Sequence, residues 1–229
     1  PIGAWTSKLA TRLNDNLPSY VRVGGLGGHP ASGFFEVQHA PLPISKPDAG
    51  LQNSAVRKGM TRERFDRNLD LAAKIDAGFR RRYDARPVRA YSDLYEDAIR
   101  MMRSEDVAAF DISNEPRETR DAYGKDAFGQ GCLLARRLVE KGVRFVEVDL
   151  GGWGSHTDQH TGVAESSAGL DAGLPTLLND LKQRGLLDTT LVVLATEFGR
   201  TPEIDEYDGR SHHPLAYTCL LAGGGVTGG

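Results

Sequence analysis

The sequence has 229 residues, of which 39% are hydrophobic and 26% charged, and these proportions are typical of a globular domain with one substantial core. Its formal net charge of -3 and its pI near 6.1 exclude the basic excess of nucleic-acid-binding and anionic-membrane-binding proteins, so an anionic partner has to be attracted by a local site. No apolar stretch is long enough to predict a membrane span.

Residues 1–60 are expected to be a loop-rich segment. The stretches PSYVRVGGLGGHPASGFF (18–35) and APLPISKP (40–47) are dense in glycine and proline, which interrupt helices and strands. One short apolar run, from Tyr20 to Val23, predicts a strand within this segment.

Residues 61–120 are more charged and are expected to form a helical insertion. Apolar residues recur there at roughly helical spacing, first at Phe65, Leu69, Ile75 and Phe79, and then at Val88, Tyr91, Tyr95, Ala98 and Met102. The two sets predict two amphipathic helices that are broken at the Ala-Arg-Pro sequence of residues 85–87. Acidic residues are interleaved with the arginines near this break, which favours a solvated helix face over a basic patch.

Residues 121–229 are expected to be the α/β core of the same single domain. Hydrophobic periodicity and glycine stops predict a helix over 125–141, a strand over 143–150, a helix over 163–184, a strand over 190–196 and a strand within 215–222. Because helices alternate with nearly unbroken apolar runs, the expected fold class is α/β. We expect a mostly parallel sheet that is flanked by helices and buried on both faces.

Three polar segments adjoin these predicted strands. GGWGSHTDQH (151–160) follows the first strand, EFGR (197–200) follows the second, and GRSHHP (209–214) precedes the third. Ligands of an open parallel sheet bind beyond the carboxyl ends of its strands, where such loops converge. The sequence therefore predicts a site at this edge.

Histidine and carboxylate side chains in these segments have the chemistry of a divalent metal site. The candidate metal ligands are His156, Glu197, His212, His213, Asp149 and Asp158. Adjacent side chains of an extended segment point to opposite sides, so only one of the histidine pair is expected to be a ligand. Two residues also have structural interpretations: Glu197 could pair with a nearby arginine, and His160 could lie at a helix start.

Three motifs together resemble one known family. FGQGCLLARRLVEKGVRFVEVDLGGWGSHTDQH, LVVLATEFGRTPEI and GRSHHPLAYTCLLAGGGVTGG are similar to the bacterial family labelled domain of unknown function 1501. The similarity is strong over residues 126–229 and weaker back to residue 17. That family is grouped with alkaline phosphatases, sulfatases and cofactor-independent phosphoglycerate mutases, so the resemblance implies an alkaline-phosphatase-like α/β fold.

The resemblance also implies a metal-dependent hydrolase of phosphate or sulfate esters. Such enzymes hold two divalent ions, which bind the oxyanion and activate a serine or threonine nucleophile. By motif position His156, Glu197 and one of the pair His212-His213 would be ligands of zinc, manganese or calcium. The candidates to bind the anion of a small ester substrate are Arg200 and Arg210. Members of the family commonly carry twin-arginine export signals, which would place the protein in the periplasm.

Two features depart from the family pattern. The family turn GGWDTH has an aspartate where this chain has Gly154, which cannot bind a metal, and Asp158 or Asp149 would have to compensate. The superfamily nucleophile lies on an earlier strand for which residues 1–50 offer no substitute. Because the chain also begins at Pro1 and ends on AGGGVTGG, we expect a piece of a longer protein with its nucleophile outside these residues.

Two other hypotheses compete with the hydrolase. A degenerate relative would keep the fold and act as a metal-binding, ligand-binding or scaffold protein, which Gly154 favours, whereas the retained His156 and Glu197 favour the enzyme. In the third hypothesis the same side chains form only a structural hydrogen-bonded network.

Overall fold

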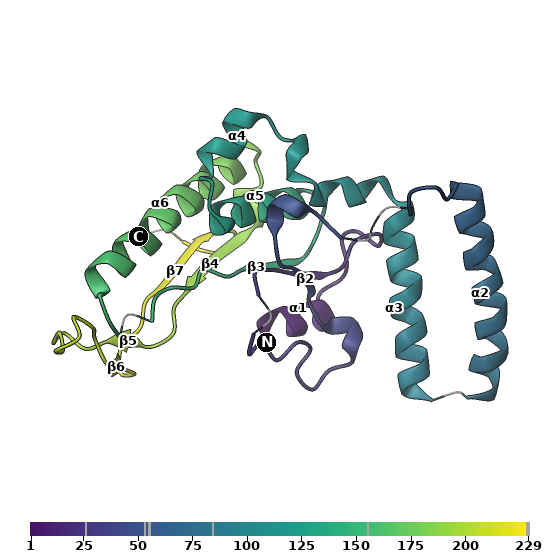
Figure 1. Ribbon diagram of the computed structural model, residues 1–229, viewed down its shortest axis with the longest axis horizontal. Helices are drawn as coiled ribbons and strands as arrows, with labels where there is room; N and C mark the ends of the chain where they lie inside the picture. The colour runs from purple at the N-terminus through teal and green to yellow at the C-terminus, as the bar shows by residue number, and fades with distance from the viewer. Residues whose placement is uncertain (26, 53, 55, 84, 155, 228–229) are drawn as a thin grey trace.

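A three-stranded parallel sheet organises the first part of the fold (Figure 1). The computed structural model describes residues 1–25, 27–52, 54, 56–83, 85–154 and 156–227. Strands β1 (Tyr20–Val23), β2 (Leu42–Ile44) and β3 (Phe145–Val148) lie in the order β2-β1-β3. All four residues of β1 are buried, as expected for a central strand, and the strand predicted at Tyr20 to Val23 is confirmed.

Helices α5 (Ala127–Glu140) and α6 (Gln159–Gln183) build the core with this sheet. Asp126 begins α5 as its N-cap, with Oδ1 accepting a hydrogen bond of 2.9 Å from the backbone N–H of Gly129. Leu133 and Leu138 of α5 are fully buried, and Leu181 of α6 packs into the same cluster. Both helices confirm the helical periodicity of the sequence, although α6 begins four residues earlier than the predicted residue 163.

The opposite face of the parallel sheet is polar and is covered by α1 (Ile2–Leu9), a helix that the sequence did not predict. Gly3 of α1 lies against the ring of Tyr20, where a Cβ atom would come within 2.5 Å. The Tyr20 hydroxyl donates to Glu147, which also pairs with Arg22. Polar side chains that alternate with the buried valines of β1 therefore form a hydrogen-bonded layer beneath α1.

A buried arginine joins α5 to its neighbours. Arg136 is 1% exposed, and its guanidinium contacts Glu115 at 2.8 Å, Glu140 at 3.0 Å and Asp180 at 2.9 Å. The contact with Glu140 is a hydrogen bond, whereas the other two are charge contacts with poorer angles. Burial opposes ionisation of Asp180, but hydrogen bonds from Arg184 and Tyr123 and the charge of Arg136 outweigh it and lower the pKa of this carboxyl.

Two long helices stand beside this body (Figure 1). They are α2 (Arg62–Arg82) and α3 (Arg86–Arg103), so the two helices predicted on either side of the Ala-Arg-Pro break are confirmed. Short helices make the remaining connections, namely η1 (Val37–His39), η2 (Pro47–Ala49), η3 (Glu105–Phe110), η4 (Ile112–Asn114), α4 (Arg117–Ala122) and η5 (Leu187–Thr189). In the part of the chain that the structure describes, no helix has the combined length and apolar character needed to cross a membrane.

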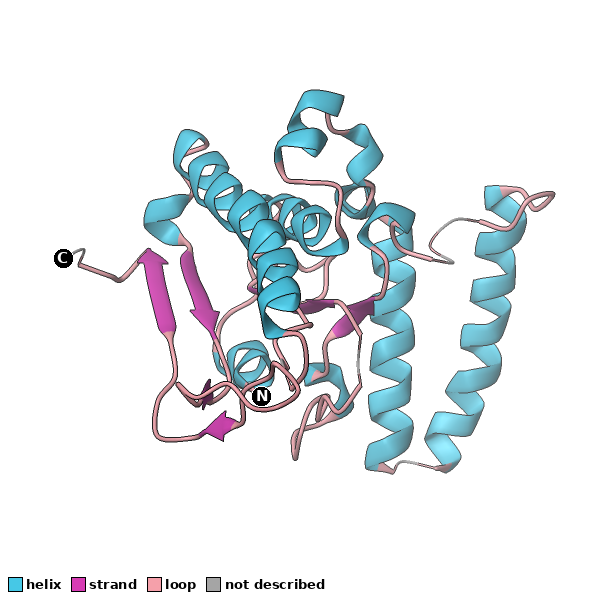
Figure 2. Cartoon of the chain, turned by 60° about the vertical axis from the view of Figure 1, so that its left-hand side comes forward, coloured by secondary structure: helices cyan, strands magenta, loops and turns pink. Residues whose placement is uncertain are grey.

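The last strands depart from the expected parallel sheet. β4 (Leu191–Ala195) pairs antiparallel with β7 (Cys219–Gly223), and a small antiparallel pair, β5 (Gly199–Arg200) with β6 (His212–His213), lies between them in sequence. Figure 2 shows β4 and β7 side by side. A parallel partner needs a crossover connection, usually a helix, and the described residues between β4 and β7 contain none.

The expected burial of β4 on both faces is also wrong. Exposed and half-buried residues alternate along this strand, and Leu191 and Val193 are each 52% exposed. A continuous apolar run is therefore compatible with a half-covered two-stranded sheet. The structure supports an α/β fold with a three-stranded parallel sheet and flanking helices.

Candidate functional site

The loop after β3 carries the first predicted site residue toward the β5–β6 pair. Backbone hydrogen bonds tie its end to the neighbouring turn: Asp158 donates to Tyr207 at 3.2 Å and Gln159 donates to Asp208 at 2.9 Å. At Gly209 an added Cβ would come within 2.1 Å of the carbonyl oxygen of His156. Only glycine permits this approach of the two backbones, so residue 209 fixes the position of His156.

The β5–β6 pair holds the other two side chains of the site. Arg200 lies opposite His212 in its register, and the backbone N–H of Thr201 extends the pairing with a 3.0 Å hydrogen bond to Ser211. The connecting turn is closed by Asp205, whose carboxylate accepts hydrogen bonds from the backbone N–H groups of Tyr207 and Gly209. The pair therefore presents Arg200 and His212 as neighbours on short, hydrogen-bonded strands.

His156, Arg200 and His212 meet as one cluster. The Nε2 atoms of His156 and His212 are 3.0 Å apart, and Nη1 of Arg200 is 3.1 Å from Nε2 of His156. Phe198 packs against His212 with ring centroids 4.4 Å apart, and the guanidinium of Arg200 lies 6.0 Å from the centroid of Phe198. Residues from two distant parts of the chain are thus brought within hydrogen-bond distance.

The hydrogen bonds of this cluster restrict the protonation of His156. An imidazole nitrogen without a proton has one lone pair, and the guanidinium of Arg200 can only donate. If Arg200 donates to Nε2 of His156, that nitrogen is unprotonated and the proton of the neutral ring is on Nδ1. A proton on Nε2 of His212 would then have to share the same lone pair. With the proton of His212 on Nδ1, its Nε2 carries a free lone pair, as a metal ligand requires.

Glu197 lies at the edge of the cluster. Its side chain is 65% exposed, and its carboxylate is 3.9 Å from Nη2 of Arg200. This contact is the arginine pairing that was the structural interpretation of Glu197. An exposed pair at this distance contributes little to stability, so it does not hold the carboxylate in place.

Gly154 also faces the cluster. A Cβ built on Gly154 would lie 3.7 Å from Nη2 of Arg200, which is ordinary contact distance. A side chain at position 154, such as the family's aspartate, would therefore reach the guanidinium. Trp153, the preceding residue, is 36% exposed in the same loop.

The other two predicted carboxylates lie elsewhere. Asp149 follows β3 and contacts Arg22 at 3.6 Å, in the polar layer of the parallel sheet. Asp158 precedes α6 with a positive φ of 43°, and its carboxylate accepts a 2.9 Å hydrogen bond from Thr161. The contacts given for these two carboxylates are thus with Arg22 and Thr161, and their compensation for Gly154 stays a prediction.

His213 and Arg210 are neighbours of the cluster with different surroundings. No hydrogen bond or ion pair of the His213 side chain is found within the described ranges, and the alternation along β6 agrees with the expectation that one histidine of the pair faces the site. Arg210 donates from Nη1 to the carbonyl oxygens of Thr201 and Pro202, and its own carbonyl accepts from Arg200. Its contacts therefore hold the β5–β6 turn.

In the described part of the chain, the cluster has fewer donors than a metal ion needs. Among the residues that the structure describes, no three histidine, cysteine, aspartate or glutamate side chains converge closely enough to hold one. A catalytic zinc site has three protein ligands, and the cluster offers two imidazole nitrogens. The donor set thus fits a metal ion only in part.

Sequence reasoning missed Phe198 and Gly209. Phe198 stands inside the EFGR segment, directly between the two residues singled out there, so its position was the available signal. Nothing in the sequence marks the backbone approach at Gly209. His160 lies in the first turn of α6, as its structural interpretation required.

Comparisons with known proteins give the family. The sequence matches the family model described as "Protein of unknown function (DUF1501)" over residues 1–229. Searches of curated proteins and of solved structures gave no match. Because the family model covers the whole sequence, the chain belongs to the DUF1501 family.

Proposed function

We propose that the protein is a metal-dependent hydrolase of phosphate or sulfate esters, in which His156 and His212 are metal ligands and Arg200 binds the anion of the ester. The observation that carries the proposal is the convergence of two imidazole Nε2 atoms, 3.0 Å apart, beside a guanidinium 3.1 Å away. The reaction class, hydrolysis of phosphate or sulfate esters, is inferred from the resemblance of the three sequence motifs to their family.

The two imidazoles support the metal part of the proposal. Both rings are on exposed residues at the end of a loop and a short strand, where an ion and a substrate could enter. A divalent ion bound there would polarise an ester oxygen and lower the pKa of a bound water. The exposed carboxylate of Glu197 is the candidate for a third donor, since among the described residues its ion pair is a 3.9 Å contact with Arg200 of the cluster.

Arg200 supports the anion part. Its side chain is 16% exposed, packs near the ring of Phe198 and donates to the carbonyl of Arg210, so the guanidinium is held in position. A planar guanidinium can offer two parallel N–H groups to phosphate or sulfate oxygens. An ester that approaches the histidine pair would therefore meet a fixed positive charge.

One observation favours a second candidate, a degenerate relative that binds a ligand without hydrolysing it. Gly154 faces Arg200 and provides no carboxylate at the position where the family has aspartate. Only two donors then remain at the cluster. A site of this kind would bind an anion through Arg200 and a metal ion weakly.

Zinc titration of the purified chain tests the metal centre. We expect binding of zinc, followed by calorimetry, to weaken by at least about tenfold in His156→Ala and in His212→Ala, because each variant removes one of two ligands. His160→Ala is the matched control, since this exposed histidine lies in the first turn of α6. Equal zinc affinity in the wild type and both cluster variants would remove the metal from the proposal.

Gly154→Asp tests whether the missing carboxylate of the family turn limits metal binding. A carboxylate at this position adds a donor beside the cluster, so zinc affinity should rise by about tenfold or more.

An ester hydrolysis assay separates the enzyme from the degenerate relative. Hydrolysis of aryl phosphate and aryl sulfate esters would be assayed with the full-length gene product and added zinc, manganese or calcium. Activity of the wild type that is lost in Arg200→Gln supports the hydrolase. Metal binding with no hydrolysis supports the second candidate and refutes the first.

A further inference from the structure

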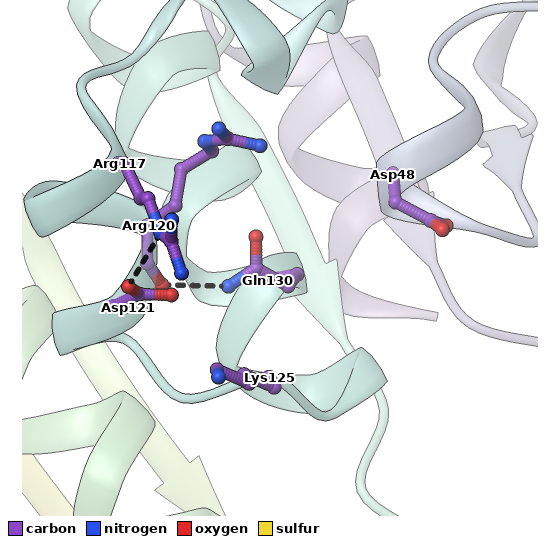
Figure 3. A pocket seen from close by; sticks show the side chains of 6 residues that line it. All are labelled: Asp48, Arg117, Arg120, Asp121, Lys125 and Gln130. Carbon is purple, nitrogen blue, oxygen red and sulfur yellow. Dashed lines mark hydrogen bonds and ion pairs between the residues drawn. The ribbon is translucent and has the colours of Figure 1, made fainter.

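A second charged site lies away from the histidine cluster. A cavity of about 450 Å³ between α4, the start of α5 and η2 is lined by Asp48, Arg117, Arg120, Asp121, Lys125 and Gln130 (Figure 3). Figure 1 shows α4 at the top of the molecule and β5 and β6 at its lower left, well apart from each other. Three of the lining side chains are cationic and two are anionic, so the cavity is positively charged.

Two of the three cations have no counter-ion. Arg117 pairs with Asp121 at 3.4 Å, which leaves these two charges balanced. Within the described parts of the chain, the side chains of Arg120 and Lys125 make no hydrogen bond or ion pair. The Nε atom of Arg120 is shielded from solvent and also lacks a partner. Arg120 and Lys125 therefore bring two positive charges without a counter-ion to the lining of the cavity.

The backbone that carries these cations is fixed. The side-chain nitrogen Nε2 of Gln130 donates to the backbone carbonyl oxygen of Arg120 at 2.9 Å and to that of Gly124. Tyr123, between the two cations, is fully buried, and its carbonyl lies so close to Gly129 that an added Cβ would be 1.8 Å away. A site that is already rigid loses little conformational entropy when a ligand binds.

We propose that this cavity binds a small phosphate monoester whose phosphate contacts Arg120 and Lys125 and whose hydroxyl group donates to Asp48. Two unpaired cations match the charge of a phosphate dianion, and a guanidinium beside an ammonium is a common combination for phosphate. Asp48 lies on η2 across the cavity from these cations, with its carboxylate turned away from them in Figure 3, so a ligand hydroxyl rather than the phosphate would be its partner. The site is independent of the proposed hydrolase centre.

Calorimetry with inorganic phosphate and glycerol 3-phosphate tests this site on the purified chain. We expect saturable binding of both, weakened about tenfold in Arg120→Gln and in Lys125→Gln, because each variant removes a charge-assisted hydrogen bond. Lys58→Gln, at an exposed lysine outside the cavity, is the control for loss of charge. Lys125 is exposed, so its variant should keep the wild-type melting temperature and fold.

Two further variants identify where and how the ligand binds. Asp48→Ala should remove the preference for glycerol 3-phosphate over inorganic phosphate while binding of inorganic phosphate persists. Arg200→Gln should remove phosphate binding at the histidine cluster, to which Arg200 belongs, while the affinity of the cavity for both ligands stays the same. The site is refuted if the wild type shows no saturable binding, or if Arg120→Gln and Lys125→Gln bind like Lys58→Gln. Loss of all binding in Arg200→Gln alone would assign the phosphate to the histidine cluster instead and also refute it.

Discussion

Arg136 and Arg200 are the centres of two polar clusters that differ in burial and in the balance of charge. Arg136 is 1% exposed and contacts three carboxylates, whereas Arg200 lies beside two histidines on exposed short segments. In the first cluster each charge is balanced by another side chain of the protein. In the second, Nε2 atoms of two imidazole rings lie 3.0 Å apart, and the carboxylate of Glu197, which is 3.9 Å from Arg200, is exposed. The comparison shows how a cluster that stabilises the fold differs from one suited to an external ligand.

The largest expected effect is on the buried cluster. Arg136→Met keeps an unbranched side chain but removes the guanidinium and its positive charge, which leaves Glu115 and Asp180 without their shared partner. Breaking a buried ion pair from one side costs about 3–5 kcal/mol, so urea unfolding should show a loss of that size. Arg117→Gln, at a side chain that is 80% exposed, is the matched control. A loss below about 1 kcal/mol in Arg136→Met would mean that the cluster does not stabilise the fold.

Acid should weaken the buried cluster next. Burial disfavours the charged forms of Glu115 and Asp180, but contacts with Arg136 and its neighbours outweigh burial and lower the pKa of both carboxyl groups. Groups with a folded pKa below the unfolded value, 4.5 for Glu and 3.8 for Asp, stabilise the protein above that value. Their contribution is lost as the pH falls through the folded pKa.

Urea unfolding between pH 3 and 7 measures this contribution. The free energy of unfolding should hold its value above about pH 5 and decrease below about pH 4.5, in keeping with the proton-linkage relation. In Arg136→Met the decrease should be shallower, because each of the two carboxyl groups has lost one of the cations that lower its pKa. An identical pH profile in the wild type and the variant would contradict this explanation.

The smallest expected effect is on the exposed cluster. His212→Ala, measured without added metal, should change the free energy of unfolding by no more than about 0.5 kcal/mol, because substitutions of exposed residues usually have small effects. The same variant is expected to lose zinc affinity, so stability and binding would separate. A loss of about 2 kcal/mol or more would instead support the structural hydrogen-bonded network, in which these side chains hold the fold.

Helix α5 shows what the sequence could predict. Its periodic leucines, the Asp126 cap and the Gly142 stop gave a helix over 125–141, and the structure has it at Ala127–Glu140. These signals are local, since each acts within one or two turns of the helix. The grouping of His156 with His212 and Arg200 was expected at the carboxyl ends of one parallel sheet, whereas the structure brings these residues together from β3 and the β5–β6 pair, which belong to separate sheets.

Contacts between residues that are distant in the sequence could not be predicted in this way. Whether β4 pairs in parallel or antiparallel depends on the path of the connecting segment, which hydrophobic periodicity does not describe. The partners of Arg136 are 21 residues before it at Glu115 and 44 residues after it at Asp180, so their contact exists only in the folded chain. For the same reason the sequence could not reveal that Asp149 turns toward Arg22 and leaves the histidine cluster.

Trp153 provides a spectroscopic means of following the histidine cluster. The chain has two tryptophans, and the other, Trp5 of α1, packs against Phe34 and Phe35. Trp153 is 36% exposed and lies three residues before His156, so its indole emission responds to the polarity of the loop that carries this histidine. In a Trp5→Phe background, the tryptophan fluorescence of the chain would come from this loop alone. Zinc or anion binding at the cluster could then be titrated optically, without an added label.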